Sequence, residues 1–150
     1  MANSGAAEPI LVCDKLSSGW GATQVIDRVS LRLEANETLV VLGRNGVGKT
    51  TLLSTLIRRA AQKGGSIVFR GRTIDRMPPH QRARFGIGFV PQEREIFPSL
   101  TVLENLTIAA RPGPWDLRRV FELFPRLDER RGNLGRQLSG GEQQMLAIAR

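Results

Sequence analysis

One glycine-rich stretch of the chain reads Gly43-Arg44-Asn45-Gly46-Val47-Gly48-Lys49-Thr50-Thr51. Residues 38–42, directly before it, form a continuous apolar and β-branched run, which is typical of a strand buried on both faces of a parallel sheet. After it, residues 50–61 place apolar side chains at helical spacing, and Gly64 and Gly65 are the expected end of that helix. The sequence therefore predicts a buried strand, a glycine loop and a helix in direct succession.

The glycine stretch fits the phosphate-loop pattern G-x-x-x-x-G-K-[ST]. Backbone N–H groups can surround a triphosphate only where side chains do not block the approach, which accounts for Gly46 and Gly48. The helix that follows contributes its N-terminal N–H groups and its dipole. Lys49 is suited to the β- and γ-phosphates and the Thr50 hydroxyl to Mg²⁺. We therefore predict a nucleotide-phosphate site, because a chance glycine turn would not explain the strand and helix on either side.

A second glycine segment reads Leu138-Ser139-Gly140-Gly141-Glu142-Gln143 and precedes residues 141–150, which have helical spacing. Ser139 is a good N-cap, and the two glycines expose backbone N–H groups at a helix start. On these grounds the segment is a second anion site or a plain capped helix, and its shape alone leaves both open.

The second segment resembles the signature motif of ATP-binding cassette (ABC) ATPases. In that family the signature of one subunit closes over the ATP held by the P-loop of the other, in a head-to-tail dimer. The resemblance implies that Ser139 and Gly141 touch the γ-phosphate of the ATP bound to the other subunit. Gln92, in Val-Pro-Gln, stands where the family has its Q-loop, which implies contact with Mg²⁺ and the attacking water. Trp20, between two glycines, stands where the family has an adenine-stacking aromatic residue; the alternative is a half-buried packing anchor.

The resemblance thus implies ATP and Mg²⁺ as cofactors, with Gln92 as the catalytic residue and Thr50 and Gln92 as the metal-binding residues. The implied ATP-binding residues are Trp20, Gly43, Asn45, Gly46, Gly48, Lys49, Thr50, Thr51, Ser139, Gly140 and Gly141.

The expected fold is α/β: a P-loop NTPase core of the ABC ATPase type with a helical subdomain, incomplete at the C-terminus. We expect a disordered leader at residues 1–9, the nucleotide-binding core at 10–91, the helical subdomain at 92–139 and the signature helix at 140–150. Further strands are expected at residues 10–16, 25–33, 66–69 and 86–90, and a turn at 17–21. Further helices are expected at 78–84, 116–124 and 101–110, the last opened by a Thr101–Glu104 capping box.

Three segments, residues 88–106, 122–127 and 138–150, resemble the smaller ATPase of branched-chain amino acid importers. Urea or short-chain amide importers share much of this pattern and stay open. The resemblance implies an ATPase homodimer or heterodimer, membrane permease subunits and, indirectly, a solute-binding protein as partners. It also implies a cytoplasmic location, peripheral on the inner face of the cell membrane. Ile96, Phe97 and Pro98 are expected either to face the membrane subunit or to pack the hinge of the subdomain.

Composition narrows the function classes. The net charge is +8, with 19 Arg and 3 Lys, but the arginines are spread without a long basic run, so we expect no nucleic-acid partner. The positive charge also raises the hypothesis of a DNA-handling relative of the same ATPases, and the short linker between Gln92 and Ser139 argues against that hypothesis. No apolar run reaches the ~20 residues that span a bilayer. The start lacks a signal-peptide pattern and Cys13 is alone, which indicates a reducing cytoplasm.

The family pattern also includes an apolar strand ending in Asp-Glu and a later histidine, both after the signature helix. Neither occurs within these 150 residues, and His80 stands in the wrong place to serve as that histidine. Our hypothesis is that the sequence is a fragment of a longer ATPase. Taken alone, these residues support a nucleotide-binding module without hydrolysis.

Overall fold

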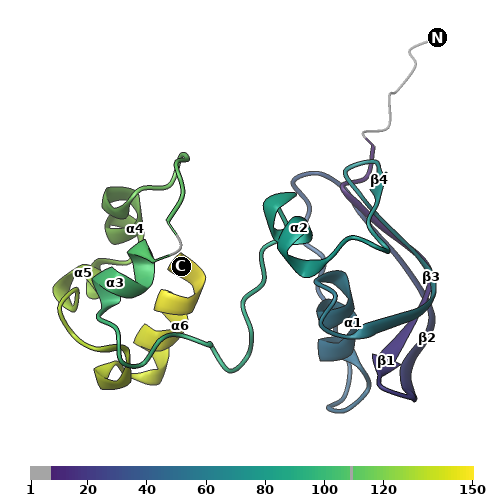
Figure 1. Cartoon of the computed structure of the whole chain (residues 1–150), viewed down its shortest axis with the longest axis horizontal. Coiled ribbons are helices and arrows are strands. Elements are labelled where there is room, and N and C mark those ends of the chain that lie inside the picture. The colour runs from purple at the N-terminus through teal and green to yellow at the C-terminus, as the bar shows by residue number, and fades with distance from the viewer. Residues whose placement is uncertain (1–7, 109) are drawn as a thin grey trace, which may run out of the picture. The chain divides into compact units, whose positions relative to one another are not determined.

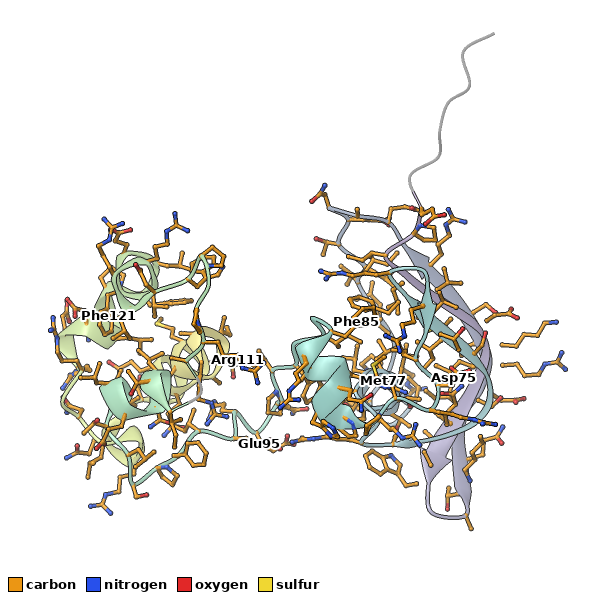
Figure 2. The ribbon with its side chains drawn as sticks, turned by 45° about the horizontal axis from the view of Figure 1, so that its top comes forward. Asp75, Met77, Phe85, Glu95, Arg111 and Phe121 are labelled. Carbon is orange, nitrogen blue, oxygen red and sulfur yellow. The ribbon has the colours of Figure 1, made fainter. Side chains whose placement is uncertain are left out.

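The computed structural model describes residues 8–108 and 110–150, and the chain forms two compact units, Met1–Gly88 and Phe89–Arg150. Figure 1 shows the first unit as a sheet with helices beside it and the second as a group of short helices, and Figure 2 adds the side chains of both. The leader expected at residues 1–9 lies outside the described residues except for Glu8 and Pro9.

The first unit is built on an antiparallel sheet with the strand order β2-β1-β3-β4. β1 pairs with both β2 and β3, with Leu11 opposite Leu33 on one side and Phe69 on the other. The strands are β1 Leu11–Trp20, β2 Thr23–Leu33, β3 Ala61–Phe69 and β4 Arg72–Thr73. The strands expected at residues 10–16, 25–33 and 66–69 are therefore present as parts of β1, β2 and β3.

Two helices belong to this unit, α1 Lys49–Leu56 and α2 Pro79–Arg84. The core between sheet and helices consists of Cys13, Leu16, Ile26, Leu52, Ile67, Phe69 and Ile74. Burial raises the pKa of the Cys13 thiol to about 11, and the nearby Asp75 charge adds to this, so the thiol is unreactive at neutral pH. α2 begins at a proline, as its sequence predicts.

The turn expected at residues 17–21 is wrong, because β1 continues to Trp20 and the chain turns at Gly21 and Ala22. Both neighbouring strands pair with this end of β1, with Gly19 opposite Gln24 and Ala61. A Cβ at Gly19 would overlap the carbonyl oxygen of Thr23. The glycine therefore serves close strand pairing and not a turn.

The strands expected at residues 38–42 and 86–90 are also wrong, since neither segment has strand structure. Leu42 is 84% exposed and Val40 67%. A buried parallel strand needs hydrogen-bonded neighbours, and the described residues provide no strand that pairs with either segment. Residues 38–42 thus have the apolar, β-branched composition of a strand, but no described strand pairs with them.

The helix expected at residues 50–61 is shorter than predicted, because α1 ends at Leu56 and Gly64 and Gly65 lie inside β3. The buried Arg82 guanidinium donates to the carbonyl oxygens of Thr55 and Leu56 at 2.9 and 2.8 Å. These carbonyls belong to the last turn of α1, so Arg82 satisfies acceptors that a longer helix would have used.

The second unit contains α3 Val102–Thr107, α4 Leu117–Leu123, α5 Pro125–Glu129, the 3-10 helix η1 Gly135–Gln137 and α6 Gly140–Ala149. Its core is Val102, Leu106, Leu127, Leu138 and Leu146. The Thr101–Glu104 capping box is confirmed, although α3 ends at Thr107. α4 lies within the helix expected at residues 116–124, and Pro125 begins α5 directly after it. The signature helix α6 begins at Gly140, as expected, and ends at Ala149.

Candidate functional site

The glycine loop leads directly into α1. Gly46 and Gly48 have φ values of +83° and +103°, a left-handed backbone that residues with a Cβ adopt only under strain. A Cβ at Gly46 would meet nothing within 4 Å, whereas one at Gly48 would lie 3.2 Å from Val25 Cγ1. The first hydrogen bond of the helix runs from the Leu52 N–H to the Gly48 oxygen at 2.9 Å. The loop thus has the backbone geometry that its glycines predict, with open space at Gly46.

The Lys49 amine lies across this loop and donates to the carbonyl oxygens of Gly43 and Arg44 at 2.6 and 2.8 Å. Both acceptors are neutral, and no ion pair joins Lys49 to a carboxylate among the residues that the structure describes. The ammonium charge is therefore held in place but not neutralised. A group in this position can pair with an anion that enters the loop.

Trp20 and Thr51 connect the loop helix to the sheet. The indole Nε1–H of Trp20 donates to Thr51 Oγ1 at 3.2 Å, and the Trp20 side chain is 48% exposed. The Thr51 side chain is buried, while Thr50 beside it is exposed. One turn later the Thr55 hydroxyl is hydrogen-bonded to Ser18 Oγ at 2.8 Å. The end of β1 thus fixes the first two turns of α1.

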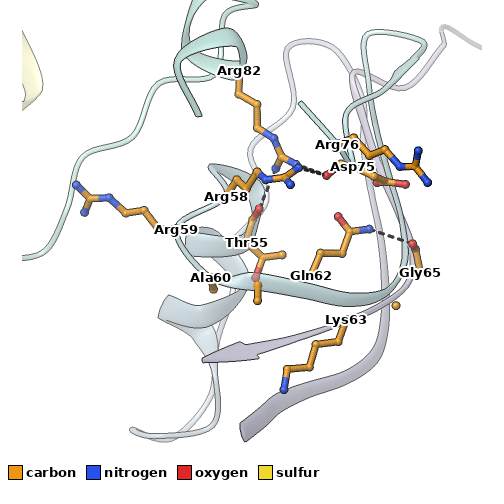
Figure 3. Close-up of a pocket in the computed structure, with 12 residues that line it drawn as sticks. Thr55, Arg58, Arg59, Ala60, Gln62, Lys63, Gly65, Asp75, Arg76 and Arg82 are labelled. Atoms are coloured by element: carbon orange, nitrogen blue, oxygen red, sulfur yellow. Dashed lines mark hydrogen bonds between the residues drawn. The ribbon is translucent and has the colours of Figure 1, made fainter. Parts of the chain in front are cut away.

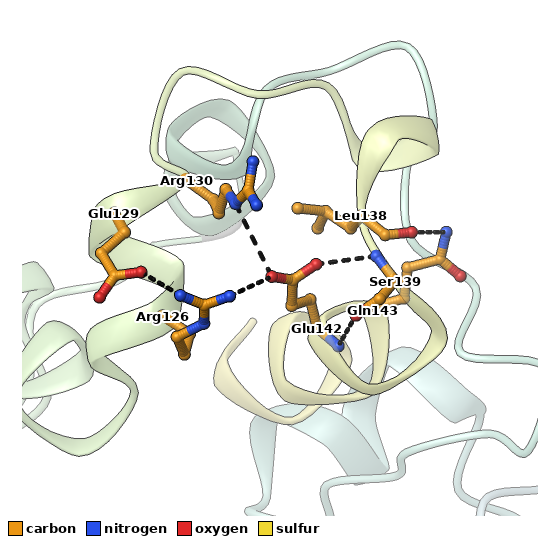
Figure 4. Close-up of polar contacts among 7 residues, drawn as sticks. All are labelled: Arg126, Glu129, Arg130, Leu138, Ser139, Glu142 and Gln143. Carbon is orange, nitrogen blue, oxygen red and sulfur yellow. Dashed lines mark hydrogen bonds and ion pairs between the residues drawn. The ribbon is translucent and has the colours of Figure 1, made fainter.

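The signature segment forms the start of α6 (Figure 4). Ser139 Oγ accepts from the Glu142 N–H at 3.3 Å, and Glu142 Oε2 accepts from the Ser139 N–H at 2.8 Å, which is a complete capping box. Glu142 Oε1 also lies 3.8 Å from nitrogens of Arg126 and Arg130. The backbone hydrogen bond from Ser139 is the main cause that lowers the pKa of Glu142, followed by the Ser139 side chain and the two arginines. The carboxylate is therefore ionised at neutral pH and committed to the cap.

Gly140 and Gly141 are exposed at this helix start. The first N–H groups of a helix have no partner within the helix, so those of the two glycines can meet an external acceptor. A Cβ at Gly141 would meet nothing within 4 Å. The second glycine segment thus has the geometry of an anion site, in addition to its role as a cap.

The predicted site residues fall into two groups. The first unit contains Trp20, Gly43, Asn45, Gly46, Gly48, Lys49, Thr50 and Thr51. The second contains Gln92, Ser139, Gly140 and Gly141. Gln92 is exposed in a segment without regular structure. Among the described residues, no group of three or more His, Cys, Asp or Glu side chains could hold a metal ion.

Sequence reasoning missed Arg82, which lines a cavity of about 630 Å³ at the far end of α1 (Figure 3). Its guanidinium donates to backbone carbonyls, including that of Ile74 at 2.7 Å, and burial is the main cause that lowers its pKa. Figure 3 shows the side chains of Arg59 and Arg76 extending away from the cavity, so their charges are not concentrated inside it. A basic residue in the middle of α2 gave no sequence signal of this capping role.

Comparison with known proteins shows to which family the chain belongs. The sequence profile of the ABC transporter family matches residues 26–150. The chain belongs to the ABC transporter family. Solved ABC structures share this fold: a nucleotide-free ATP-binding cassette, 23% identical, has a TM-score of 0.76 over 94% of this chain and 63% of its own. An ATP-binding subunit of an ABC transporter, 25% identical, has a TM-score of 0.77 over 93% of this chain and 60% of its own.

Two relatives of this ABC chain are each 39% identical to it. One is the high-affinity branched-chain amino acid transport ATP-binding protein BraG of Pseudomonas aeruginosa, aligned over 94% of this chain and 63% of its own. The other is the lipopolysaccharide export system ATP-binding protein LptB of Haemophilus influenzae, aligned over 94% and 61%. A third, the probable branched-chain amino acid transport ATP-binding protein LivF of Archaeoglobus fulgidus, is 35% identical over 90% and 59%. The chain therefore spans about three-fifths of the length of these relatives.

The family confirms the predicted fold class, a P-loop ABC ATPase core with a helical subdomain. It also confirms the resemblance to branched-chain amino acid transport ATPases, although LptB matches equally well. No helix within residues 8–108 and 110–150 is both long and apolar enough to cross a membrane.

Proposed function

We propose that this ABC chain binds Mg²⁺-ATP in its glycine loop and forms part of the ATPase of an importer for branched-chain amino acids. The position of the Lys49 amine over the loop is the observation that carries ATP binding. The lysine is already held by two neutral carbonyls, so it exchanges weak partners for phosphate oxygens without being removed from an ion pair.

The other groups of the loop have complementary roles. The α1 N-terminus directs its free N–H groups and dipole at the phosphates, since the helix begins at Lys49 itself. The exposed Thr50 hydroxyl and the Gln92 amide are the residues that fit Mg²⁺, because both supply oxygen ligands. Gln92 then orients the attacking water, and Trp20, half exposed beside α1, stacks on adenine.

The signature supplies the other half of a second pocket. Ser139, Gly140 and Gly141 bind the γ-phosphate of ATP held by another ATPase subunit, in a head-to-tail dimer. The capping box supports this role, because it fixes the helix start through Ser139 and Glu142 without using the N–H groups of the two glycines. Permease subunits, a solute-binding protein acting through them, and a location on the inner face of the membrane belong to the same proposal.

Isothermal titration of the chain with Mg²⁺-ATP tests the binding step. Lys49→Ala is expected to weaken binding at least tenfold, the factor for ~1.4 kcal/mol, because it removes a charge-assisted contact to phosphate. Lys63→Ala is the matched control, since Lys63 also donates to a backbone carbonyl, that of Ala22, but away from the loop. Equal ATP affinity of Lys49→Ala and the unmodified chain contradicts the proposal.

The transported solute needs a separate test, because the LptB match favours lipopolysaccharide export as a second candidate. Residues 10–150 replace the matching part of BraG in one chimera and of LptB in another. Restored leucine uptake with the first chimera alone supports the importer. Restored lipopolysaccharide export with the second alone refutes it and supports the exporter.

A further inference from the structure

The segment after Gln92 is held by the signature helix at two points. Near the start of α6, the Arg94 Nη1–H donates to Gln143 Oε1 at 3.4 Å. At its end, Arg150 Nη2–H donates to the Glu95 carbonyl oxygen at 2.9 Å, and the Arg150 guanidinium lies 4.8 Å from the centre of the Phe97 ring. α6 and its C-cap Arg150 thus contact three positions within residues 94–97.

Gln143 extends the first of these contacts into the segment before the signature. Its Nε2 donates to the carbonyl oxygens of Gly135 and Leu138 at 3.2 and 3.3 Å, the second of which is drawn in Figure 4. The side chain therefore uses both ends of its amide, one for Arg94 and one for the backbone leading to Ser139. A glutamate or a lysine at position 143 could not do both.

The backbone conformation at Arg94 and Glu95 is costly, so this segment needs contacts that stabilise it. Their φ values are +64° and +48°, which residues with a Cβ adopt only at a cost. The Arg94 guanidinium also lies against the first turn of α6, since a Cβ at Gly140 would be 3.3 Å from its Nη2. A cation beside the positive end of a helix dipole is electrostatically unfavourable. Specific contacts must therefore compensate for both features.

A third residue fixes the far end of the same segment. Asn105 on α3 is fully buried, accepts from the Phe97 N–H at 2.9 Å and donates to the Phe97 oxygen at 3.0 Å. Residues 94–97 are thus held by α6 and α3 together, within one compact unit.

We propose that Arg94 is a positioning residue for the signature: through Gln143 it fixes the first turn of α6, so that a shift of residues 94–97 moves Ser139, Gly140 and Gly141 with them. The functional consequence rests on the proposed role of the signature in binding the ATP of a second subunit. The mechanical linkage itself requires no nucleotide.

Hydrogen exchange without nucleotide tests the linkage alone. Arg94→Ala and Gln143→Ala are each expected to speed exchange about tenfold at both residues 94–97 and 140–143, the factor that ~1.4 kcal/mol gives. The double variant should exchange no faster than Gln143→Ala alone, because Gln143→Ala already removes the contact with Arg94 together with the two backbone contacts of Gln143. Arg136→Ala and Gln144→Ala, an exposed arginine and the next residue on α6, serve as controls and should change neither segment. Faster exchange at only one segment, or additive effects, overturns the proposal.

A second measurement separates positioning from general loss of structure. Arg94→Ala should leave the affinity of the monomer for ATP without Mg²⁺ unchanged, because the glycine loop is in the other unit, while weakening Mg²⁺-ATP-driven dimerisation about tenfold. Arg94→Lys, which keeps one donor, should recover part of that loss. Unchanged dimerisation in Arg94→Ala overturns the role in positioning. If the unmodified chain binds no ATP, the proposed function fails, and the exchange result still decides the linkage.

Discussion

Asn105 offers a sharp test of how the second unit is stabilised. Its carboxamide is fully buried on α3 and reaches back to the segment before that helix. Oδ1 accepts from the Phe97 N–H, and Nδ2 lies within hydrogen-bond distance of the carbonyl oxygens of Phe97, Leu100 and Thr101. The perturbation is Asn105→Ala, which removes every one of these contacts.

The expected cost follows from counting the bonds that coexist. Nδ2 has two hydrogens, so it makes two of its three recorded contacts at a time, and Oδ1 makes one more. At ~1 kcal/mol of net stability for each bond, the substitution costs about 3 kcal/mol. For a unit of this size, 3 kcal/mol lowers the midpoint of thermal unfolding by at least about 12 °C.

The chain has two tryptophans, Trp20 in the first unit and Trp115 in the second, so fluorescence can follow one unit at a time. In a Trp20→Phe background, Trp115 reports unfolding of the second unit alone. The control is Asn133→Ala, a half-buried asparagine of the same unit whose carboxamide makes no hydrogen bond with the described residues. A Trp115 transition that moves by less than about 4 °C in Asn105→Ala refutes the reasoning, because it corresponds to under 1 kcal/mol.

Three further predictions concern the cap, the buried arginine and the loop. Because the pKa of Glu142 is lowered in the folded chain, its carboxylate stabilises the start of α6 at pH values above its ordinary pKa of 4.5. This stabilisation is lost as the pH falls through the lowered pKa of the folded chain. The protection of amides 140–143 against hydrogen exchange, relative to their intrinsic exchange rates at each pH, should therefore fall on acidification, and Glu142→Gln should remove that dependence. Arg82→Met should destabilise the first unit by about 3 kcal/mol, seen by Trp20 fluorescence in urea, because its carbonyl partners lose a charged donor. Gly48→Ala should weaken ATP binding in titration, since φ of +103° and the contact with Val25 both oppose a Cβ.

Local signals in the sequence predicted the parts of the site that depend on neighbouring residues. Glycines at positions 46 and 48 have the left-handed backbone that their pattern requires. The caps at Thr101 and Ser139 form because donor and acceptor are only three residues apart. These interactions need little from the remainder of the chain, so a short window of sequence defines them.

The errors concern elements that depend on distant partners. Residues 38–42 have strong β-propensity, but a strand forms only where another strand can pair with it. The end of α1 depends on Arg82, which is 27 residues beyond Thr55 in the chain. The contact between Arg94 and Gln143 spans 49 residues and belongs to no pattern. Sequence periodicity contains no information about such pairs.

The central claim is that the two glycine segments complete different pockets, each shared with another subunit. Lys49→Ala disables the loop, and Gly141→Asp disables the signature, because it adds a negative charge where open space would admit a phosphate. Sedimentation velocity with Mg²⁺-ATP measures dimer formation. The account predicts no ATP-driven dimer for either variant alone and a heterodimer in their equimolar mixture, which retains one intact composite pocket. ATP-driven dimers of Gly141→Asp alone, or none in the mixture although the unmodified chain dimerises, would contradict it.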